Sequence, residues 1–255
     1  GLRAHLLYGR ALVNSKYFHE AELIADEVEK GTRPIPNQER DEDTALAAAE
    51  ALLLKSEALF GLDHSLRSSQ ALSSAKQALR AGVHNRELLG RASLIDLKLK
   101  SRECNRLPSR GPLDEGQIRD QLNRRGLCLL ETLLFFRKTM ETGDIRSTVS
   151  AISEIEGSFR EYVELCARPL EHRIMRQYEP KPNPSGDALE LDKPSIEKRR
   201  QSQAELIDIL RQECQVNQKN AFDLMQDWRK VFPPAMSEPL SELANRLEKL
   251  QRRAF

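Results

Sequence analysis

The chain has 255 residues, of which 31% are charged and 39% hydrophobic, a balance typical of a protein with a sizeable core and many exposed helix faces. Its 40 Lys and Arg residues against 39 Asp and Glu give a net charge of +1, which argues against a dedicated nucleic-acid binder because no overall field attracts a polyanion. No stretch is apolar over the roughly 18 residues that a membrane span requires, so we expect no membrane partner. A helical pattern starts directly after Gly1, and we therefore expect the chain to be a piece of a longer protein.

Residues with reactive or metal-binding side chains are scattered. Cys104, Cys128, Cys166 and Cys214 form no Cys-x-x-Cys pair, so we expect reduced thiols, neither a zinc site nor a disulfide framework, and a cytoplasmic or nuclear location. The five histidines show neither a pair four residues apart nor a His-Glu-x-x-His motif. No glycine-rich phosphate loop, Gly-x-Ser-x-Gly motif or Cys–His signature is present. We expect no metal, no cofactor and no enzymatic activity.

The first 30 residues predict two helices that are separated near residues 14–17, because apolar and small residues recur at helical spacing on either side. Tyr8 and Gly9, Leu12, Phe18 and Ala21 follow one another in an order that resembles the tetratricopeptide repeat. Tyr8-Gly9 stands at the Leu-Gly of the family motif, Leu12 and Phe18 at its aromatic positions, and Ala21 at its central alanine. Small residues at these places allow two antiparallel helices to approach closely.

Further helices follow a polar connector with two prolines at residues 31–43. One is predicted over residues 44–60, with Thr44 as its cap, and another over 66–80. A third, over about 89–104, opens on a Leu-Gly pair like that of the family motif. The resemblance thus extends over roughly the first 100 residues.

The chain also departs from the family motif. His5, Lys16 and Ala25 stand where the family has Trp, the turn Gly and a later Phe, so the repeat is degenerate. The carboxylate clamp with which some members hold a chaperone tail uses Lys and Asn, and those positions carry Leu6 and Arg10 here. We therefore do not expect this chain to bind a chaperone tail.

The resemblance implies that the first helix of each hairpin lines a groove suited to an extended or helical peptide. The positions that would line it are Arg3, Leu6, Arg10, Val13, Asn14, Glu57, Phe60, Arg91 and Leu94. Among these, the candidate partner-binding residues are Arg3, Arg10, Asn14, Glu57 and Arg91.

The second half of the chain predicts longer helices. Residues 127–136 are apolar except for Glu131 and Thr132, which predicts a helix over about 117–141 that is buried on every side. A helix from Ile145 past residue 166 carries apolar residues three or four apart. Residues 179–194 contain four prolines and predict a linker or a long surface loop.

The strongest periodicity lies in a helix predicted from Ser195 to just before Pro233. Its apolar seam comprises Ile207, Leu210, Cys214, Asn217, Ala221, Leu224, Trp228 and Val231. Phe222 and Met225 widen this apolar surface, so we predict that both lie at or near a protein-contact surface. The alternative is that they belong to the internal core of a bundle. A last helix, from Ser237, buries one side.

Together these patterns predict an all-α protein with TPR-like helical hairpins over residues 1–107 and a bundle of long antiparallel helices over 108–255, with a Pro-rich linker at 179–194. The function that fits best is a noncatalytic scaffold or adaptor that binds a peptide or helix of a partner protein. A second copy of the chain is a further candidate partner. The alternative is an RNA- or DNA-associated subunit that uses local patches of Arg and Lys, such as residues 198–200.

Overall fold

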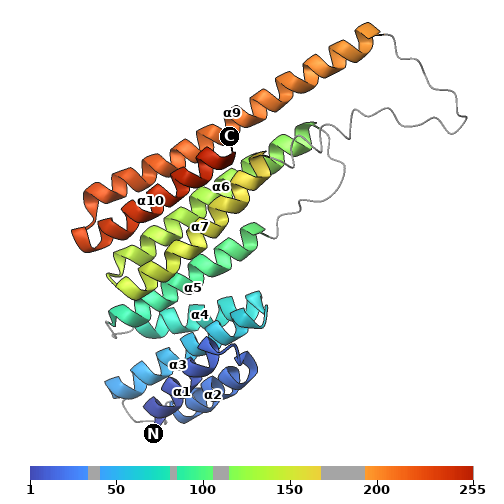
Figure 1. Ribbon diagram of the computed structural model, residues 1–255. Helices are drawn as coiled ribbons and strands as arrows, with labels where there is room; N and C mark the ends of the chain where they lie inside the picture. The colour runs from blue at the N-terminus through green and yellow to red at the C-terminus, as the bar shows by residue number, and fades with distance from the viewer. Residues whose placement is uncertain (34–40, 81–84, 106–114, 168–192, 255) are drawn as a thin grey trace, which may run out of the picture. The chain divides into compact units, whose positions relative to one another are not determined.

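The computed structural model describes residues 1–33, 41–80, 85–105, 115–167 and 193–254, and within these ranges the chain is all α-helix with no strand (Figure 1). The prediction of an all-α protein is confirmed. The helices are α1 (Leu2–Asn14), α2 (Phe18–Gly31), α3 (Glu42–Gly61), α4 (Ser65–Arg80), α5 (Arg86–Asn105), α6 (Glu115–Glu141), α7 (Ile145–Ala167), α9 (Lys193–Val231) and α10 (Pro234–Ala254). No helix in these ranges has the length and apolar character needed to span a bilayer.

The chain forms two compact units. Unit 1 comprises Gly1–Arg102 and Leu134–Glu154, and unit 2 comprises Glu103–Leu133 and Ile155–Phe255. Helices α1 to α4 belong to unit 1 and α9 and α10 to unit 2, whereas α5, α6 and α7 contribute residues to both. The predicted domain division after residue 107 stays a prediction. Most of the predicted linker, residues 179–192, lies outside the described residues, and its last two residues begin α9.

Short helical hairpins build unit 1, in which α1 packs on α2 and α3, and α3 packs on α2 and α4. The α1–α2 and α3–α4 turns each have three residues, and the middle one takes a left-handed conformation, with φ of 65° at Lys16 and 62° at Asp63. In both turns a backbone N–H after this residue donates to a carbonyl five residues earlier, over 2.9 Å. This hydrogen bond is the one that closes a helix in the Schellman motif.

The core of unit 1 consists of small and branched apolar side chains from successive helices. One buried cluster comprises Leu6, Ala25, Val28, Ala51 and Leu54, and another comprises Ala49, Leu53, Leu72, Ala75, Leu79, Leu88, Ala92 and Ile95. Gly9 allows α1 to lie close to α3, because a Cβ at this position would collide with the side chain of Leu54. Gly61 likewise faces the ring of Phe18, whose nearest atoms would touch an added Cβ.

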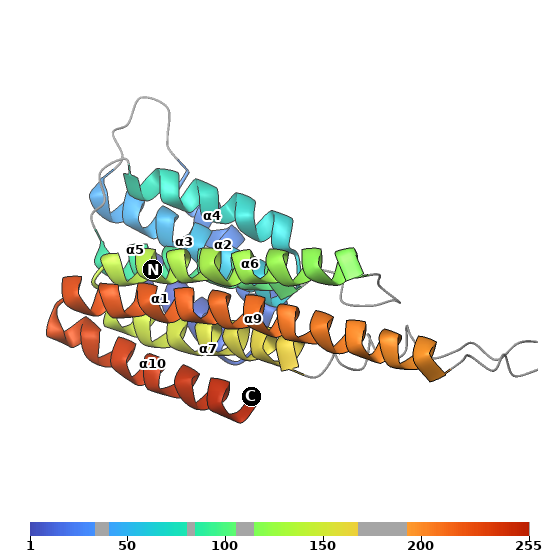
Figure 2. The ribbon, with the colours of Figure 1, turned by 90° about the horizontal axis from the view of Figure 1, so that it is seen from above.

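Unit 2 contains the longest helix. Helices α9 and α10 lie side by side and run in opposite directions in both views (Figure 1, Figure 2). The buried seam of α9 comprises Leu210, Cys214, Gln218, Ala221, Met225 and Trp228. The predicted seam differs at three positions. It contained Asn217 and Leu224, whereas the next residues, Gln218 and Met225, are the fully buried ones. It also contained Val231, which is exposed. The error arises because the apolar face of an α-helix drifts relative to a strict seven-residue repeat.

Helix α6 has a solvent-exposed stripe, so the prediction that it is buried on every side is wrong. Leu127 is 61% exposed and Leu134 48% exposed, and Glu131 between them is exposed too. These residues follow one another at intervals of four and three, which places them on one face of the helix. The opposite face is buried, with Leu129, Leu133 and other apolar side chains.

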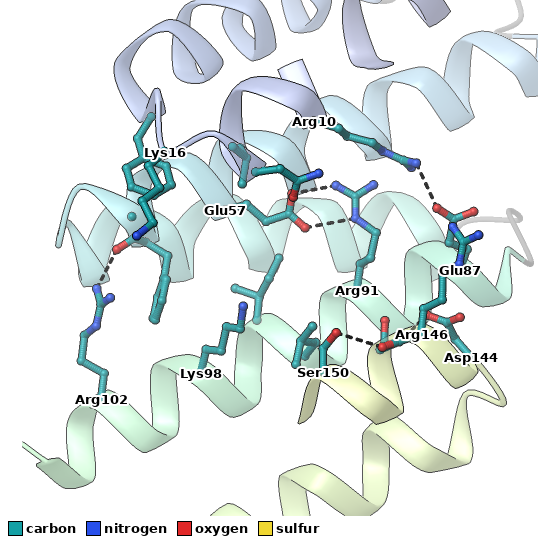
Figure 3. Close-up of a pocket in the computed structure, with 18 residues that line it drawn as sticks. Arg10, Lys16, Glu57, Glu87, Arg91, Lys98, Arg102, Asp144, Arg146 and Ser150 are labelled. Carbon is teal, nitrogen blue, oxygen red and sulfur yellow. Dashed lines mark hydrogen bonds and ion pairs between the residues drawn. The ribbon is translucent and has the colours of Figure 1, made fainter. Parts of the chain in front are cut away.

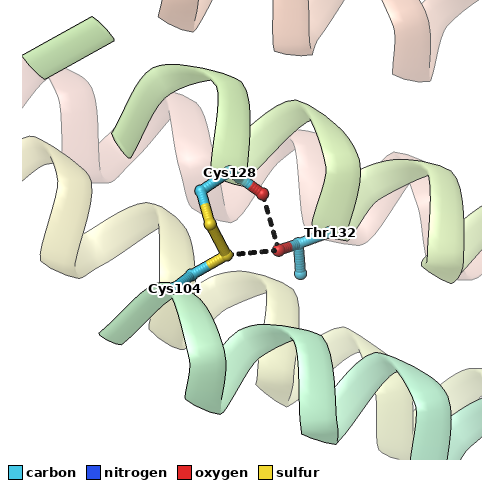
Figure 4. The surroundings of a disulfide bond; sticks show 3 residues. All are labelled: Cys104, Cys128 and Thr132. Atoms are coloured by element: carbon cyan, nitrogen blue, oxygen red, sulfur yellow. Dashed lines mark hydrogen bonds between the residues drawn. A yellow bond between two sulfur atoms is a disulfide. The ribbon is translucent and has the colours of Figure 1, made fainter. Parts of the chain in front are cut away.

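Two disulfide bonds lie in unit 2, and the prediction of reduced thiols is therefore wrong. Cys104 at the end of α5 pairs with Cys128 of α6, with Cα atoms 5.7 Å apart, and Cys166 pairs with Cys214 with Cα atoms 6.1 Å apart. Thr132, one turn after Cys128, donates to the carbonyl of Cys128 at 2.8 Å and contacts the sulfur of Cys104 (Figure 4). Spacing along the chain could not reveal these pairs, because their partners are 24 and 48 residues apart.

Candidate functional site

A groove of about 780 Å³ lies in unit 1, and we refer to it as the unit 1 groove. Its walls come from α1, the α1–α2 turn, the first residue of α2, α3, α5 and the beginning of α7 (Figure 3). Its lining comprises Arg10, Val13, Asn14, Lys16, Phe18, Glu57, Phe60, Gly61, Glu87, Arg91, Leu94, Ile95, Lys98, Arg102, Asp144, Arg146, Ser147 and Ser150. Charged side chains thus surround a smaller set of apolar ones.

The groove brings together most of the positions that the sequence selected in the first half of the chain. Arg10, Asn14, Glu57 and Arg91 all line it, although they come from three different helices. Arg3 is exposed and lines a neighbouring pocket of about 430 Å³, which shares Arg10 with the groove. Binding of a partner by these residues stays a prediction.

An ion-pair network connects the three helices in the middle of the groove. Arg91 of α5 binds Glu57 of α3 through two hydrogen bonds of 3.0 and 2.7 Å, and its other nitrogen lies 3.6 Å from Glu50. Arg10 of α1 pairs with Glu50 and, at 3.0 Å, with Glu87. The two arginines and their carboxylates therefore hold α1, α3 and α5 together before any partner is considered.

Arg91 is the most enclosed charge of this network, with 13% of its side chain exposed. Burial disfavours its charged form, but the carboxylates of Glu57, Glu50 and Glu87 outweigh this effect and raise the pKa of Arg91 above its ordinary value. The guanidinium is held charged and oriented by its neighbours. Its first role is to fix the shape of the groove.

Arg102 closes one end of the groove. Its guanidinium lies 3.5 Å from the centre of the Phe60 ring and donates to the Phe60 carbonyl at 2.7 Å and to Asp63 at 3.1 Å. A cation at the last carbonyls of α3 also complements the helix dipole. Arg102 is thus engaged in holding α5 against the end of α3, and one face of the Phe60 ring is covered.

Three further cations line the groove without such partners. Within the described residues, Lys16, Lys98 and Arg146 form no ion pair. The acidic residues of the lining are engaged: Glu57 and Glu87 bind arginines, and Asp144 accepts a hydrogen bond of 3.2 Å from the backbone of Ser147 at the start of α7. Figure 3 shows Lys16 and Lys98 on the side of the groove that holds Arg102, and Arg146 beside Asp144.

Sequence reasoning missed these three cations. Lys98 was within reach, because it lies seven residues after Arg91 on α5 and so on the same face of the helix. In the sequence, Lys16 stands out only as the residue that replaces the turn glycine of the repeat motif. Arg146 follows Arg102, the last lining residue of α5, by more than 40 positions, and no local pattern links it to the residues of α1, α3 and α5.

The two candidate residues of α9 have different surroundings from those predicted. Met225 is fully buried in the seam of α9, so its side chain is not itself exposed to a partner, and the prediction that it lies at or near a protein-contact surface stays a prediction. Phe222 is half-buried, and its ring packs edge-to-face on Phe159 with centroids 5.7 Å apart. The apolar width of α9 is used within unit 2, as the bundle-core alternative expected.

No protein-family model matches the chain, and no curated protein matches it. A solved structure from "Computational Design of Self-Assembling Cyclic Protein Homooligomers" aligns with 99% of this chain and 92% of its own at 12% identity and a TM-score of 0.35. A likeness at this TM-score carries no argument about fold, assembly or function. Within the described residues, no three His, Cys, Asp or Glu side chains gather in a way that could hold a metal ion.

Proposed function

We propose that the chain is a noncatalytic scaffold or adaptor that holds a peptide or helix of a partner protein in the unit 1 groove. The observation that carries this proposal is the groove itself, about 780 Å³ in volume, with Val13, Phe18, Phe60 and Leu94 among charged side chains. Apolar contacts supply affinity to a bound segment, and surrounding charges orient it.

The ion-pair network supports the proposal because it preorganises the groove. Arg91 and Arg10 connect three helices, so the walls do not need to be ordered when a ligand arrives. Ordering of loops and side chains is a main cost of association, and a rigid wall avoids it. Asn14 is exposed at the groove and takes no part in this network among the residues that the structure describes, so it is available to a ligand.

We also propose that α1 to α5 are degenerate TPR-like repeats. In support, the α1–α2 and α3–α4 hairpins have the same three-residue turn, and Lys16 has a φ of 65°, the conformation that glycine favours at the family's turn position. Gly9 and Ala21 are both buried, and this supports the proposal because the motif has small residues where its helices approach closely. The two disulfides argue against the predicted cytoplasmic or nuclear location, because disulfides are rare in these reducing compartments.

Site-specific photo-crosslinking tests the scaffold proposal. The photoreactive residue p-benzoylphenylalanine replaces Asn14 in the groove or, as a matched control, the exposed Ser73 on α4. After incubation with extract of the native source, we expect a protein to be crosslinked through position 14 and not through position 73. A purified form of that protein should then bind the chain directly, and less well when Leu94 in the groove is replaced by Asp.

Crosslinks that form equally at both positions would contradict the proposal. Nuclease-sensitive crosslinks to RNA or DNA would favour the alternative function instead.

A further inference from the structure

The chemistry of the unit 1 groove points to a particular kind of ligand. Its lining contains six cationic residues and three acidic ones. Arg10, Arg91 and Arg102 are engaged with carboxylates of the chain, and each acidic residue of the lining has a partner as well. Among the described residues, the charge that remains without a partner at this groove is therefore Lys16, Lys98 and Arg146, and all of it is positive.

We propose that the unit 1 groove binds an acidic segment of a partner protein, whose carboxylates pair with Lys16, Lys98 and Arg146 while an apolar side chain contacts the floor around Val13 and Leu94. This inference rests on the proposed function and adds the chemistry of the ligand. Lys16 and Arg146 are exposed and Lys98 is half-buried, so a carboxylate can reach them without disturbing the core. Charge complementarity of this kind sets specificity and the rate of association.

A protein segment fits the groove better than a nucleic acid. Single-stranded nucleic acids bind through aromatic faces on which bases stack, and the guanidinium of Arg102 covers one face of the Phe60 ring at 3.5 Å. The three unpaired cations come from the α1–α2 turn, α5 and α7 rather than from one continuous row that could follow a phosphate backbone. Val13 and Leu94 offer apolar surface that a side chain can use and a phosphate cannot.

Fluorescence anisotropy with two labelled peptides tests the inference. In the first peptide, pairs of Glu flank two Leu residues and one Phe, and in the second, every Glu is replaced by Gln. We expect the Glu peptide to bind at least about tenfold more tightly at low salt, since each of three partly exposed ion pairs adds a fraction of the affinity. The difference should shrink as salt is added, because screening weakens such pairs.

Two triple variants distinguish the effect of the groove cations from the effect of the net charge of the protein. Lys16→Ala, Lys98→Ala and Arg146→Ala together should weaken the Glu peptide about tenfold or more and leave the Gln peptide unchanged. The control triple, Lys30→Ala, Arg33→Ala and Arg80→Ala, removes the same charge from exposed residues of unit 1 outside the groove and should change neither affinity. Circular dichroism of both variants checks that each remains folded.

The outcomes distinguish the acidic ligand from the peptide-binding role of the unit 1 groove. Equal loss with the control triple, or equal binding of both peptides, overturns the acidic ligand; the scaffold proposal then still stands if Leu94→Asp abolishes binding. Failure of every peptide to bind contradicts the groove as a peptide site and the inference with it. An oligothymidine that binds more tightly than the Glu peptide, and that the groove triple weakens, would assign the three cations to nucleic acid.

Discussion

The interactions that stabilise unit 1 differ from those that stabilise unit 2. In unit 1, ion pairs join different helices, among them Arg10–Glu50, Lys55–Asp26, Lys55–Glu29, Arg67–Glu22, Lys76–Asp96, Arg91–Glu57 and Arg102–Asp63. In unit 2, Arg119–Glu213 and Arg246–Glu156 also join different helices. Several other ion pairs of unit 2 connect residues three or four apart on one helix, as in Arg124–Asp120, Lys230–Asp227 and Arg252–Glu248. All four cysteines of the chain belong to unit 2 and form its two disulfides.

The difference follows from helix length. Helices α1 to α4 have 13 to 20 residues, and each buries a short stripe of alanines and leucines against its neighbours. Charges at the rim of such small contacts fix which helices pair and in what register. Helix α9 has 39 residues and buries a long apolar seam. One disulfide, Cys166–Cys214, joins α7 to α9, and the other, Cys104–Cys128, joins α5 to α6. The groove whose walls are joined by ion pairs between helices belongs to unit 1.

Reduction of the disulfides should produce the largest effect. In the chain-entropy model, loops of 24 and 48 residues contribute about 3 and 4 kcal/mol to the free energy of unfolding. Denaturation followed through Trp228, the chain's single tryptophan and a buried residue of unit 2, should shift strongly to lower denaturant when a phosphine reductant is added. Hydrogen exchange of α1 to α4 should change little. An equal loss of protection in both units would mean that they unfold as one.

A charge in the core of unit 2 should have the next largest effect. Leu133 of α6 is fully buried, so Leu133→Asp leaves an unpaired carboxylate inside and should cost about 4 kcal/mol or more, enough to unfold a protein of ordinary stability. Its neighbour Leu134 is 48% exposed, and Leu134→Asp should lower the thermal midpoint only slightly. Thermal unfolding followed by circular dichroism compares the two variants. Similar midpoints would mean that α6 is not oriented as described.

The ion pairs of the two units should differ in strength. Arg91→Met leaves Glu57 without its partner in an enclosed site and should lower the free energy of unfolding of unit 1 by about 2 kcal/mol. Arg119→Met in unit 2 removes an ion pair of 2.7 Å to Glu213, but the Arg119 side chain is 56% exposed, so the loss should stay below about 1 kcal/mol. Urea denaturation, with hydrogen exchange to locate the loss, measures both. Equal losses would refute a special role for the unit 1 network.

Unit 2 should also have its own response to alkali. Burial raises the pKa of Tyr162 to about 12, against about 10 in an unfolded chain. Because the folded state holds this proton more tightly, its stabilising contribution is complete below pH 10 and is lost as the pH rises from 10 to 12. The loss at pH 11 should be about 1 kcal/mol. Denaturation followed by the fluorescence of Trp228 should show that the free energy of unfolding falls as the pH rises from 10 to 12. In Tyr162→Phe this fall should be smaller. An unchanged slope would place the alkaline loss on other groups.

The sequence predicted much of the fold because local rules decided it. The turn after Asn14 and the helix end before Gly143 were both placed correctly, since glycine or a polar residue interrupts the apolar period there. The cap of α3 was misplaced by three residues: Asp41, rather than Thr44, is the cap, and it accepts a hydrogen bond of 2.7 Å from the Thr44 backbone. That bond also lowers the pKa of Asp41.

Long-range features could not be read from the sequence. Four of the candidate residues, Arg10, Asn14, Glu57 and Arg91, line the unit 1 groove, but Arg146 reaches it from a helix that lies far along the chain. The disulfide partners and the exposed face of α6 depend on which helices become neighbours, and periodicity does not specify neighbours. On α9, period alone could not decide whether Asn217 or Gln218 would be buried.

The smallest predicted change in stability concerns Asn217 and Gln218 of α9. Asn217 is half-buried at the edge of the seam, where its amide donates to the hydroxyl of Tyr162 of α7 at 2.9 Å. Gln218 is fully buried, and neither its Nε2 nor its Oε1 has a hydrogen-bond partner within the described part of the chain. A buried amide without partners costs about 1 to 3 kcal/mol of desolvation.

Gln218→Met keeps the length of the side chain and removes the buried amide, so unit 2 should gain about 1 kcal/mol, seen as a higher denaturation midpoint through Trp228. The neighbouring variant Asn217→Leu should instead lose stability, because the hydroxyl of Tyr162 loses its donor and Gly126 of α6 packs directly against the Asn217 amide. Opposite signs at adjacent positions would show that burial, rather than the polarity of the α9 seam as such, determines the cost. A loss in Gln218→Met would mean that an ordered water or a further group satisfies the amide, and that unit 2, like the groove of unit 1, contains a polar network at its centre.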